Sequence, residues 1–315
     1  MNINQLQYLR ELIHAGSFSR AAENLGISQP ALSTQIRNLE EETGLILVNR
    51  HKKPIQLTRD GESYFDLATE ILDRVELLLD LPILLTSEIT GSLRVGIIPT
   101  LAPYLISLFI DLLEEKYPGL EFIVEEMLTE TIVQNIRTGH LDAGIISTPI
   151  AADNLNFKPL FYEKFYLYVS DRHPYYHKDE IYPGEIDEKD IWYLREGNCF
   201  TNQVNSICRL AGNSGANSNL KYYTNSIESL RRIVEKEHGI TFLPELATIN
   251  IPSEYEDMIK PLAGKQAVRE ISMISTTHLI KKRHLDAVAK VLLSQLPAHM
   301  LRKPSDWIVD TDLKL

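Results

Sequence analysis

Two cysteines that lie close together are the residues of this chain best suited to chemistry. Cys199 and Cys208 are the only cysteines among the 315 residues. Cys199 follows Asn198 in a segment that predicts a loop leading into a helix from about Asn202. The positive end of a helix dipole lowers the pKa of a thiol at the helix N-terminus and makes it a better nucleophile. Arg195 would strengthen this effect if its side chain points inward. The alternative is that both cysteines are unreactive and pack as small apolar side chains.

Other kinds of reactive site have no support in the sequence. His173 and His177 have the four-residue spacing of metal ligands on a helix, but Pro174 interrupts any such helix. The chain has no glycine-rich phosphate loop and no Gly-x-Ser-x-Gly nucleophile turn. We therefore expect no metal ion and no cofactor.

The composition is typical of a globular protein. Hydrophobic residues make up 44% of the chain and charged residues 24%, which excludes collagen-like and disordered classes. No apolar run approaches the roughly 18 residues that a membrane-spanning helix needs. The first residues lack the basic and apolar segments of a secretory signal, and two cysteines cannot form a disulfide framework. We therefore expect a protein of the reducing cytoplasm with no membrane partner.

Charge is distributed unevenly along the chain. The net charge is −11, yet residues 1–60 hold seven Lys or Arg against six Asp or Glu, a net of +1. Residues 61–315 hold 25 against 37, a net of −12. An acidic body repels a polyanion, so any contact with nucleic acid is expected only in the first 60 residues.

The first 60 residues predict three short helices followed by a basic hairpin wing. Apolar residues at helical spacing begin at Leu6, and Ser17 and Ser28 are typical N-cap residues for the second and third helices. A tight turn at Gly26-Ile27 separates these two helices, as in a helix-turn-helix. The alternative is a three-helix bundle with a solvated basic loop. The candidate contacts to DNA are outward-facing residues of the third helix and basic residues that follow it, namely Gln29, Pro30, Ser33, Thr34, Arg37, Arg50, Lys52, Lys53 and Arg59.

Residues 61–91 predict a dimerisation helix and a hinge. The helix contains no Gly or Pro from Glu62 to Leu81, Pro82 is expected to end it, and residues 86–92 are expected to form the hinge. The alternative is an amphipathic helix that packs on its own domain. The expected dimer seam follows a spacing of four and three residues and consists of Tyr64, Ala68, Ile71, Val75 and Leu78, widened by Phe65, Leu72 and Leu79.

The remaining residues alternate between strand and helix patterns, which predicts a parallel α/β sheet. Strands are expected at 93–98, 121–126, 143–147, 165–170, 192–194, 220–223 and 239–243. Helices are expected at 99–116, between the second and third strands up to residue 138, and at 227–237. The length suggests two lobes, lobe I from 92–162 with 269–300 and lobe II from 163–268. Residues 301–315 remain as a C-terminal tail.

The first 60 residues, called the head from here on, specifically resemble a known protein family. Ala21-Ala22, the segment Ser28-Gln29-Pro30-Ala31-Leu32-Ser33 six residues later, and Leu57-Thr58-Arg59-Asp60-Gly61 resemble the DNA-binding domain of LysR-type transcriptional regulators. The resemblance implies a winged helix-turn-helix head, a linker helix and a two-lobed α/β regulatory domain like that of periplasmic binding proteins. It also implies a homodimer or homotetramer that binds double-stranded promoter DNA and acts on RNA polymerase.

The segment around the cysteines resembles the peroxide-sensing members of that family. The resemblance rests on residues 194–200 with a second cysteine nine positions after the first, and on segments 98–105, 226–231 and 239–244. It implies that peroxide attacks Cys199, that Cys208 forms a disulfide with it, and that cellular thiol reductants reset the pair. Thr100, Thr129 and Asn198 would line the peroxide pocket. Asn198 stands where the family often has His, and Thr201 where it often has a basic residue.

Three hypotheses follow for the function. The first is a regulator of oxidative-stress genes that senses hydrogen peroxide through a reversible Cys199–Cys208 disulfide. The second is a LysR-type regulator that binds a small metabolite between the lobes and has structural cysteines. The third, an enzyme such as a thiol peroxidase, is disfavoured because a DNA-binding head and a linker helix have no catalytic purpose.

Overall fold

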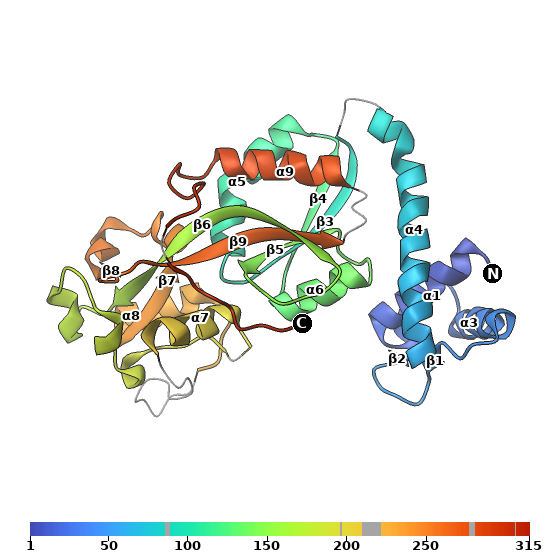
Figure 1. Cartoon of the computed structure of the whole chain (residues 1–315), viewed down its shortest axis with the longest axis horizontal. Helices are drawn as coiled ribbons and strands as arrows, with labels where there is room; N and C mark the ends of the chain where they lie inside the picture. The colour runs from blue at the N-terminus through green and yellow to red at the C-terminus, as the bar shows by residue number, and fades with distance from the viewer. Residues whose placement is uncertain (86–88, 196, 210–221, 277–280, 306) are drawn as a thin grey trace.

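The computed structural model describes residues 1–85, 89–195, 197–209, 222–276, 281–305 and 307–315. Figure 1 shows a small helical head at one end, a long helix α4 that leaves it, and a larger α/β body. In the body, α5 and α9 lie on one side of the long strands β6 and β9, and α6 lies on the other side (Figure 1).

The head is a helix-turn-helix with a two-stranded wing. Its elements are α1 (Ile3–Ala15), α2 (Phe18–Asn24), α3 (Gln29–Thr43), β1 (Val48–Asn49) and β2 (Gln56–Leu57). The Ser28 side chain caps α3 by accepting a hydrogen bond from the Ala31 amide at 3.3 Å, whereas Ser17 makes no capping bond. Leu9, Leu32 and other apolar side chains of the three helices form one core. The polar face of α3 is therefore left on the outside.

The helix α4 (Arg59–Leu85) continues past the proline that was expected to end it. Pro82 lies only three residues before the last residue of the helix, so it removes one backbone hydrogen bond within the final turn. At the other end, Gly61 allows the helix to approach the wing closely. A Cβ atom at Gly61 would lie 2.0 Å from the Leu47 carbonyl oxygen, which no larger residue can accommodate.

The body contains a mixed sheet together with α-helices and short 3₁₀ helices. The strands are β3 (Gly91–Ile97), β4 (Leu120–Glu126), β5 (Ala143–Thr148), β6 (Leu155–Val169), β7 (Ile240–Pro244), β8 (Ile259–Pro261), β9 (Ala267–Thr276) and β10 (Trp307–Ile308). The α-helices are α5 (Ala102–Lys116), α6 (Thr129–Arg137), α7 (Cys199–Cys208), α8 (Ile227–Lys236) and α9 (Lys282–Ser294). The 3₁₀ helices are η1 (Pro174–His177), η2 (Pro183–Glu185), η3 (Glu188–Asp190), η4 (Glu245–Thr248) and η5 (Ser253–Met258).

The expectation of a parallel sheet is wrong for most of the body. The strand order is β4-β3-β5-β9-β6-β7, with β10 beside β9 and β8 beside β6. β3 runs parallel to β4 and β5, but β9 runs antiparallel to both β5 and β6, and β6 runs antiparallel to β7 and β8. The reason is that the chain crosses between the lobes on β6 and returns on β9, so these two long strands must run in opposite directions.

Several element boundaries also differ from those expected. Residues 192–194 form no strand, and only an isolated bridge joins Ile191 to Ile240. In the strand expected at 220–223, residues 220 and 221 lie outside the described residues, and 222 and 223 are not in a strand. The hinge expected at 86–92 lies partly outside the described residues, and Gly91 and Ser92 belong to β3.

Two hydrophobic cores organise the body, one in each lobe. The lobe I core includes Val95 and Phe109, and the lobe II core includes Phe165 and Val234. Tyr104 on α5 donates a hydrogen bond to Glu228 on α8 at 2.9 Å and so joins the lobes at one point. Among the helices that the structure describes, none combines the length and apolar character needed to cross a bilayer.

Candidate functional site

The two cysteines occupy the first and last positions of one helix. The Asn198 side chain caps α7 by accepting a hydrogen bond from the Phe200 amide at 3.1 Å, so the helix begins at Cys199 rather than near Asn202. Nine steps of helical rise separate the two Cα atoms by about 13 Å, whereas a disulfide requires less than about 7 Å. Both thiols are free and buried. A bond between them therefore requires α7 to unwind.

The helix also joins the two cores of the body. Cys199 packs in the lobe I core, and Cys208 packs in the lobe II core. Between them, Phe200 stacks on Phe165 of β6 with 5.3 Å between ring centroids. Any rearrangement of α7 therefore disturbs the packing of both lobes.

A buried arginine provides positive charge near the first cysteine. Arg269 on β9 is fully buried, and its guanidinium bonds Glu163 on β6 at 2.8 Å through Nε. Its Nη1 donates to the Thr100 hydroxyl at 3.0 Å, and its Nη2 donates to the Thr100 carbonyl at 3.2 Å. The guanidinium carbon lies 5.3 Å from the centre of the Phe200 ring, next to Cys199 in the chain. This position gives Arg269 an electrostatic influence on the thiol.

The structure brings together most of the expected peroxide-pocket residues. The Thr129 hydroxyl, at the start of α6, donates to the Cys199 sulfur at 3.8 Å. Thr100 is fully buried and linked to the same region through Arg269. The Nδ2 of Asn198 is a buried donor without a hydrogen-bond partner among the described residues. Thr129 therefore contacts the Cys199 sulfur directly, whereas Thr100 is connected to the site through Arg269 and Asn198 precedes Cys199 in the chain.

The expected low pKa of Cys199 is not what this environment produces. Burial raises the pKa of the Cys199 thiol above its ordinary value, because a thiolate in an apolar core loses its hydration. Arg269, the Thr129 hydroxyl and the amide groups at the start of α7 lower that pKa, but by less than burial raises it. Arg195 is exposed, so the condition that its side chain points inward is not met. For Cys208, burial raises the pKa to about 12.

Arg269 and Glu163 were not among the site residues predicted from the sequence. Each is followed in its strand by a residue of opposite charge, Lys164 after Glu163 and Glu270 after Arg269. The side chains of Glu163 and Arg269 meet from two strands 106 positions apart. A charged residue inside an apolar run is the signal that could have marked either one, since such residues are almost never fully buried unless they are paired. Their pairing could not be inferred, because it depends on β6 and β9 being neighbours.

Some of the expected DNA contacts bond to neighbouring side chains within the head, and the others are simply exposed. On α3, Ser33 is half-buried and accepts a hydrogen bond from Arg50 at 3.4 Å, while Arg37 is exposed and lies 3.7 Å from Glu41. Arg50 also bonds Glu40 at 2.7 Å, which holds the wing against α3. Arg50 therefore has a structural role beside any contact to phosphate. The remaining expected contacts are all exposed, namely Gln29, Pro30, Thr34, Lys52, Lys53 and Arg59.

The expected dimer seam of α4 is divided by the structure. Ala68 is buried with Leu6 of the head and with Leu72, and Tyr64 packs beside them. Phe65 is buried in the head core as well. Ile71 and Leu78 are 43% and 67% exposed, and Val75 is half-buried. The first part of the seam thus serves the head of the same chain and the second part is open, while the Leu79 side chain lies outside the described residues.

One group of three side chains in the described part of the chain has the composition of a metal site. The ligand atoms of His173, Asp190 and His238 lie within 4.8 Å of one another. However, the His173 Nδ1 accepts a hydrogen bond from the Tyr175 amide at 3.2 Å, so the neutral ring carries its proton on Nε2, which faces Asp190 at 3.4 Å. A cation on Nε2 would require that proton to move to Nδ1, against the Tyr175 N–H. The arrangement is therefore better explained as a structural His–Asp pair.

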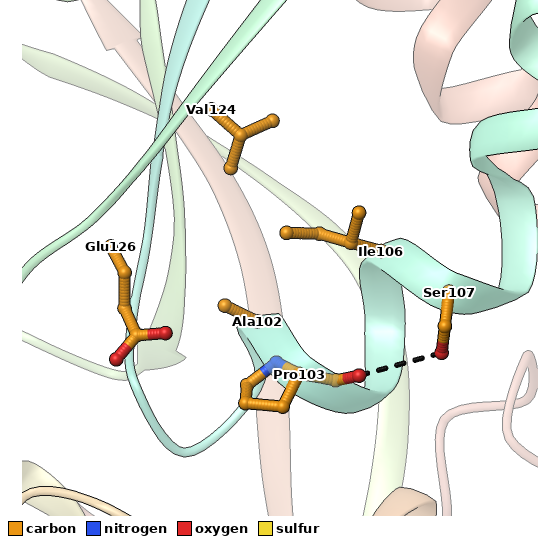
Figure 2. Close-up of a pocket in the computed structure, with 6 residues that line it drawn as sticks. All are labelled: Ala102, Pro103, Ile106, Ser107, Val124 and Glu126. Carbon is orange, nitrogen blue, oxygen red and sulfur yellow. Dashed lines mark hydrogen bonds between the residues drawn. The ribbon is translucent and has the colours of Figure 1, made fainter.

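A shallow depression of about 390 Å³ lies between α5 and β4 (Figure 2). It is lined by Ala102, Pro103, Ile106, Ser107, Val124 and Glu126. The Ser107 hydroxyl is directed to the Pro103 carbonyl at 3.4 Å, within its own helix. None of the six side chains is a thiol or a cation, so this depression lacks the groups that peroxide chemistry needs.

Comparisons with known proteins agree with the geometry. Residues 3–62 match the family described as bacterial regulatory helix-turn-helix protein, lysR family, and residues 86–300 match the LysR substrate binding domain. The chain is 36% identical over 274 residues to the hydrogen peroxide-inducible genes activator of Haemophilus influenzae, covering 87% of this chain and 90% of that protein. It is 29% identical over 306 residues to the DNA-binding transcriptional dual regulator OxyR of Escherichia coli, covering 95% and 97% of the two chains. Among solved structures, the full-length OxyR C199D of Pseudomonas aeruginosa superposes with a TM-score of 0.78 at 27% identity, covering 96% of this chain and 99% of that chain.

Proposed function

The chain belongs to the LysR family of transcriptional regulators, and on that basis we propose that it senses hydrogen peroxide through a reversible Cys199–Cys208 switch and controls oxidative-stress genes. The observation that carries the proposal is the placement of two free cysteines at the ends of α7, with Cys199 beside Thr129 and under the influence of Arg269. Relatives named as hydrogen peroxide-inducible genes activators support the same ligand.

The proposed chemistry has two steps. The Cys199 thiolate attacks one oxygen of hydrogen peroxide, the O–O bond breaks, and a sulfenic acid and hydroxide result. The Cys208 sulfur then attacks the Cys199 sulfur, and water leaves as the disulfide forms. Arg269 and Thr129 favour the first step because they stabilise negative charge on the Cys199 sulfur. The Asn198 Nδ2, which has no hydrogen-bond partner among the described residues, can donate to a peroxide oxygen from the position where the family often has His.

Reduction resets the switch. Thiol reductants in the cytoplasm would attack the disulfide and regenerate both thiols, after which α7 can fold again. The high pKa of Cys208 fits a group that acts only once Cys199 is oxidised and α7 has opened. The family is one of regulators rather than enzymes, and a sensor needs only one oxidation in each cycle.

DNA binding, dimerisation and sensing are assigned to different parts of the chain. We assign DNA binding to residues 1–60, dimerisation to residues 61–91 and sensing to the lobes in residues 92–300. The exposed residues Ile71 and Leu78 of α4 are the seam for a second copy, as a dimer or within a tetramer. Two heads then bind the half-sites of a promoter, and the oxidised form changes their spacing and the contact with RNA polymerase.

Footprinting of promoter DNA with reduced and peroxide-treated protein tests the proposal. The parent protein should change its footprint after peroxide and should contain an internal Cys199–Cys208 crosslink by mass spectrometry. Cys199→Ser should show neither change, and Cys208→Ser should form a sulfenic acid at Cys199 without the crosslink. If Cys199→Ser responds to peroxide as the parent does, the redox proposal is wrong and the metabolite-sensing alternative replaces it.

A further inference from the structure

The C-terminal segment 307–315 is built into the body and runs along both lobes. Its strand β10 pairs with β9, and the Val309 amide continues the pairing by bonding the Val268 carbonyl at 2.9 Å. Further along, the Thr311 hydroxyl donates to the Pro149 carbonyl at 2.6 Å, and the Leu315 amide donates to the Ala151 carbonyl at 2.7 Å. Figure 1 shows the segment passing α7 before it ends near α6.

Apolar contacts attach this segment to both cores. Val309 is fully buried in the lobe II core. Leu313 and Leu315 pack on the lobe I core. The segment therefore joins the lobes, in addition to the crossings on β6 and β9.

The same segment is bonded to the middle of α7, between the two cysteines. Asn202 Nδ2 donates to the Thr311 carbonyl at 3.1 Å, and Gln203 Nε2 donates to the Val309 carbonyl at 3.0 Å. Carbonyl groups two residues apart on an extended chain point to the same side, so both can receive donors from one helix. Gln203 is fully buried, and its Oε1 also accepts from Ser147 of β5 at 3.3 Å.

These bonds exist only while α7 is helical. Asn202 and Gln203 are adjacent, and the helix places their amide groups opposite the two carbonyls. Unwinding α7 withdraws both donors and leaves polar groups unpaired in or near the interior, which is unfavourable. The segment thus stabilises the form of α7 in which the cysteines cannot join.

We propose that residues 307–315 act as a clamp that holds α7 in its reduced conformation and thereby sets how readily the Cys199–Cys208 disulfide forms. Asn202 and Gln203 are positioning residues in this arrangement, since they act on the thiols through the helix. The proposal rests on the proposed function, because it concerns the equilibrium of the same switch. It adds a regulatory element that lies about 100 positions after the cysteines.

The test compares two asparagine variants of the same helix. Asn202→Ala removes one bond to the clamp, whereas Asn205→Ala changes the same residue type at a position whose Oδ1 has no partner among the described residues. Both substitutions raise the helix propensity of α7 by a similar amount. Each variant is also compared with the parent, because Asn205→Ala removes a buried unpaired oxygen and can itself stabilise reduced α7. Each protein, with all other residues unchanged, is equilibrated with mixtures of glutathione and glutathione disulfide. In that reaction one glutathione disulfide oxidises the protein dithiol and two glutathione molecules are released.

Loss of the clamp bond destabilises the reduced form and shifts the equilibrium toward the disulfide. We expect the equilibrium constant for oxidation of Asn202→Ala to exceed that of Asn205→Ala by roughly threefold to tenfold, a change of about 15 to 30 mV toward more negative potential. Hydrogen exchange of the fully reduced proteins gives a second measurement, in which segment 307–315 should exchange faster in Asn202→Ala than in Asn205→Ala. A loss of global stability alone would not distinguish the two variants in this way.

The outcomes separate the two proposals. If the parent forms the disulfide and both variants have equal equilibrium constants, the clamp is wrong and the switch stands. If the parent forms no disulfide at any glutathione ratio, the proposed function is wrong, and with it the redox role of the clamp. In that case faster exchange of 307–315 in reduced Asn202→Ala would still support a clamp on the helix, and equal exchange would overturn it.

Discussion

The reactivity of Cys199 depends on two opposing effects at a single sulfur atom. Burial disfavours the thiolate, and Arg269 favours it. Arg269 is itself neutralised by Glu163, whose second carboxylate oxygen accepts the Leu246 amide at 3.0 Å. A buried ion pair of this kind contributes little net stability, but removing one partner leaves an uncompensated charge. Because Arg269 lowers the pKa of the Cys199 thiol, the pair influences that thiol in addition to its structural role.

The reaction of Cys199 with peroxide should depend strongly on pH. Because the pKa of Cys199 is raised, the thiol is mostly protonated near neutral pH, and the rate should keep rising between pH 6 and 9 as the thiolate fraction grows. The double variant Arg269→Met with Glu163→Gln removes the pair without leaving either charge unpaired. In this variant the pKa of Cys199 should be higher still, and each unit of increase in that pKa lowers the rate at pH 7 about tenfold.

The measurement is thiol loss against pH in a Cys208→Ser background, which isolates the first step. Thr129→Val serves as a comparison, since it removes the hydroxyl that donates to the sulfur but keeps the guanidinium. A rate that is constant from pH 6 to 9, or that is unaffected by the double substitution, would contradict this account of the site.

At the scale of the secondary-structure elements, the polar face of α3 is the predicted surface for DNA. Arg37→Ala should weaken binding to the promoter site by about 1–3 kcal/mol, because an exposed guanidinium at this position can reach base edges or phosphates. Ser33→Ala should have a smaller effect, since its hydroxyl is engaged with Arg50. Fluorescence anisotropy with labelled DNA at one fixed salt concentration measures both.

A matched control comes from the partner of Arg37. Glu41→Ala removes the carboxylate 3.7 Å from the guanidinium and leaves the arginine in place, so binding should stay equal or become tighter. Should Arg37→Ala and Glu41→Ala both bind like the parent, α3 is not the recognition helix.

The helix α4 has two parts that should respond differently to the same substitution. Ile71→Asp places a charge on the exposed part, so the head should remain folded while the dimer separates. Ala68→Asp places a charge in the contact with Leu6 and Leu72, so it should lower the free energy of unfolding of the head by about 3 kcal/mol.

Sedimentation combined with thermal unfolding distinguishes these effects. The expected result is a folded monomer for Ile71→Asp and an unstable head for Ala68→Asp. A stable dimer of Ile71→Asp would show that two copies meet elsewhere on the chain.

For the whole molecule, the position of α7 between two cores predicts how oxidation spreads. Because Cys199 belongs to the lobe I core and Cys208 to the lobe II core, closing the disulfide should disturb contacts in both lobes. Hydrogen exchange after peroxide should therefore rise in α7, in the segments of both cores that touch it and in segment 307–315. The edge strand β4, at the far side of lobe I, should not change.

Cys199→Ser treated in the same way provides the control and should show no increase. The hydrogen bond from Tyr104 to Glu228 marks another place where the lobes meet, and the segments around it report whether the lobes move relative to each other. An increase in exchange confined to lobe II would mean that oxidation is a local event and is not transmitted across the body.

The sequence by itself determined the features that depend on neighbouring residues. The Ser28 cap, the turn before α3, the wing and the two cysteines on one short segment are all local, because side chains a few positions apart decide them. The family resemblance followed from these local motifs and is confirmed by the comparisons. The start of α7 at Cys199 was missed by three residues, although the Asn198 cap was already visible in the sequence.

Only the tertiary structure decided the features that join distant segments. Arg269 lies 70 positions after Cys199, and its effect on the thiol arises because β9 returns beside β6. The same return makes the sheet mixed, which the alternation of strands and helices does not reveal. Burial reverses the expected direction of the Cys199 pKa shift, since the desolvation of a thiolate depends on every segment that surrounds it. The contact of segment 307–315 with α7 belongs to the same class, because no periodicity in either segment specifies the other.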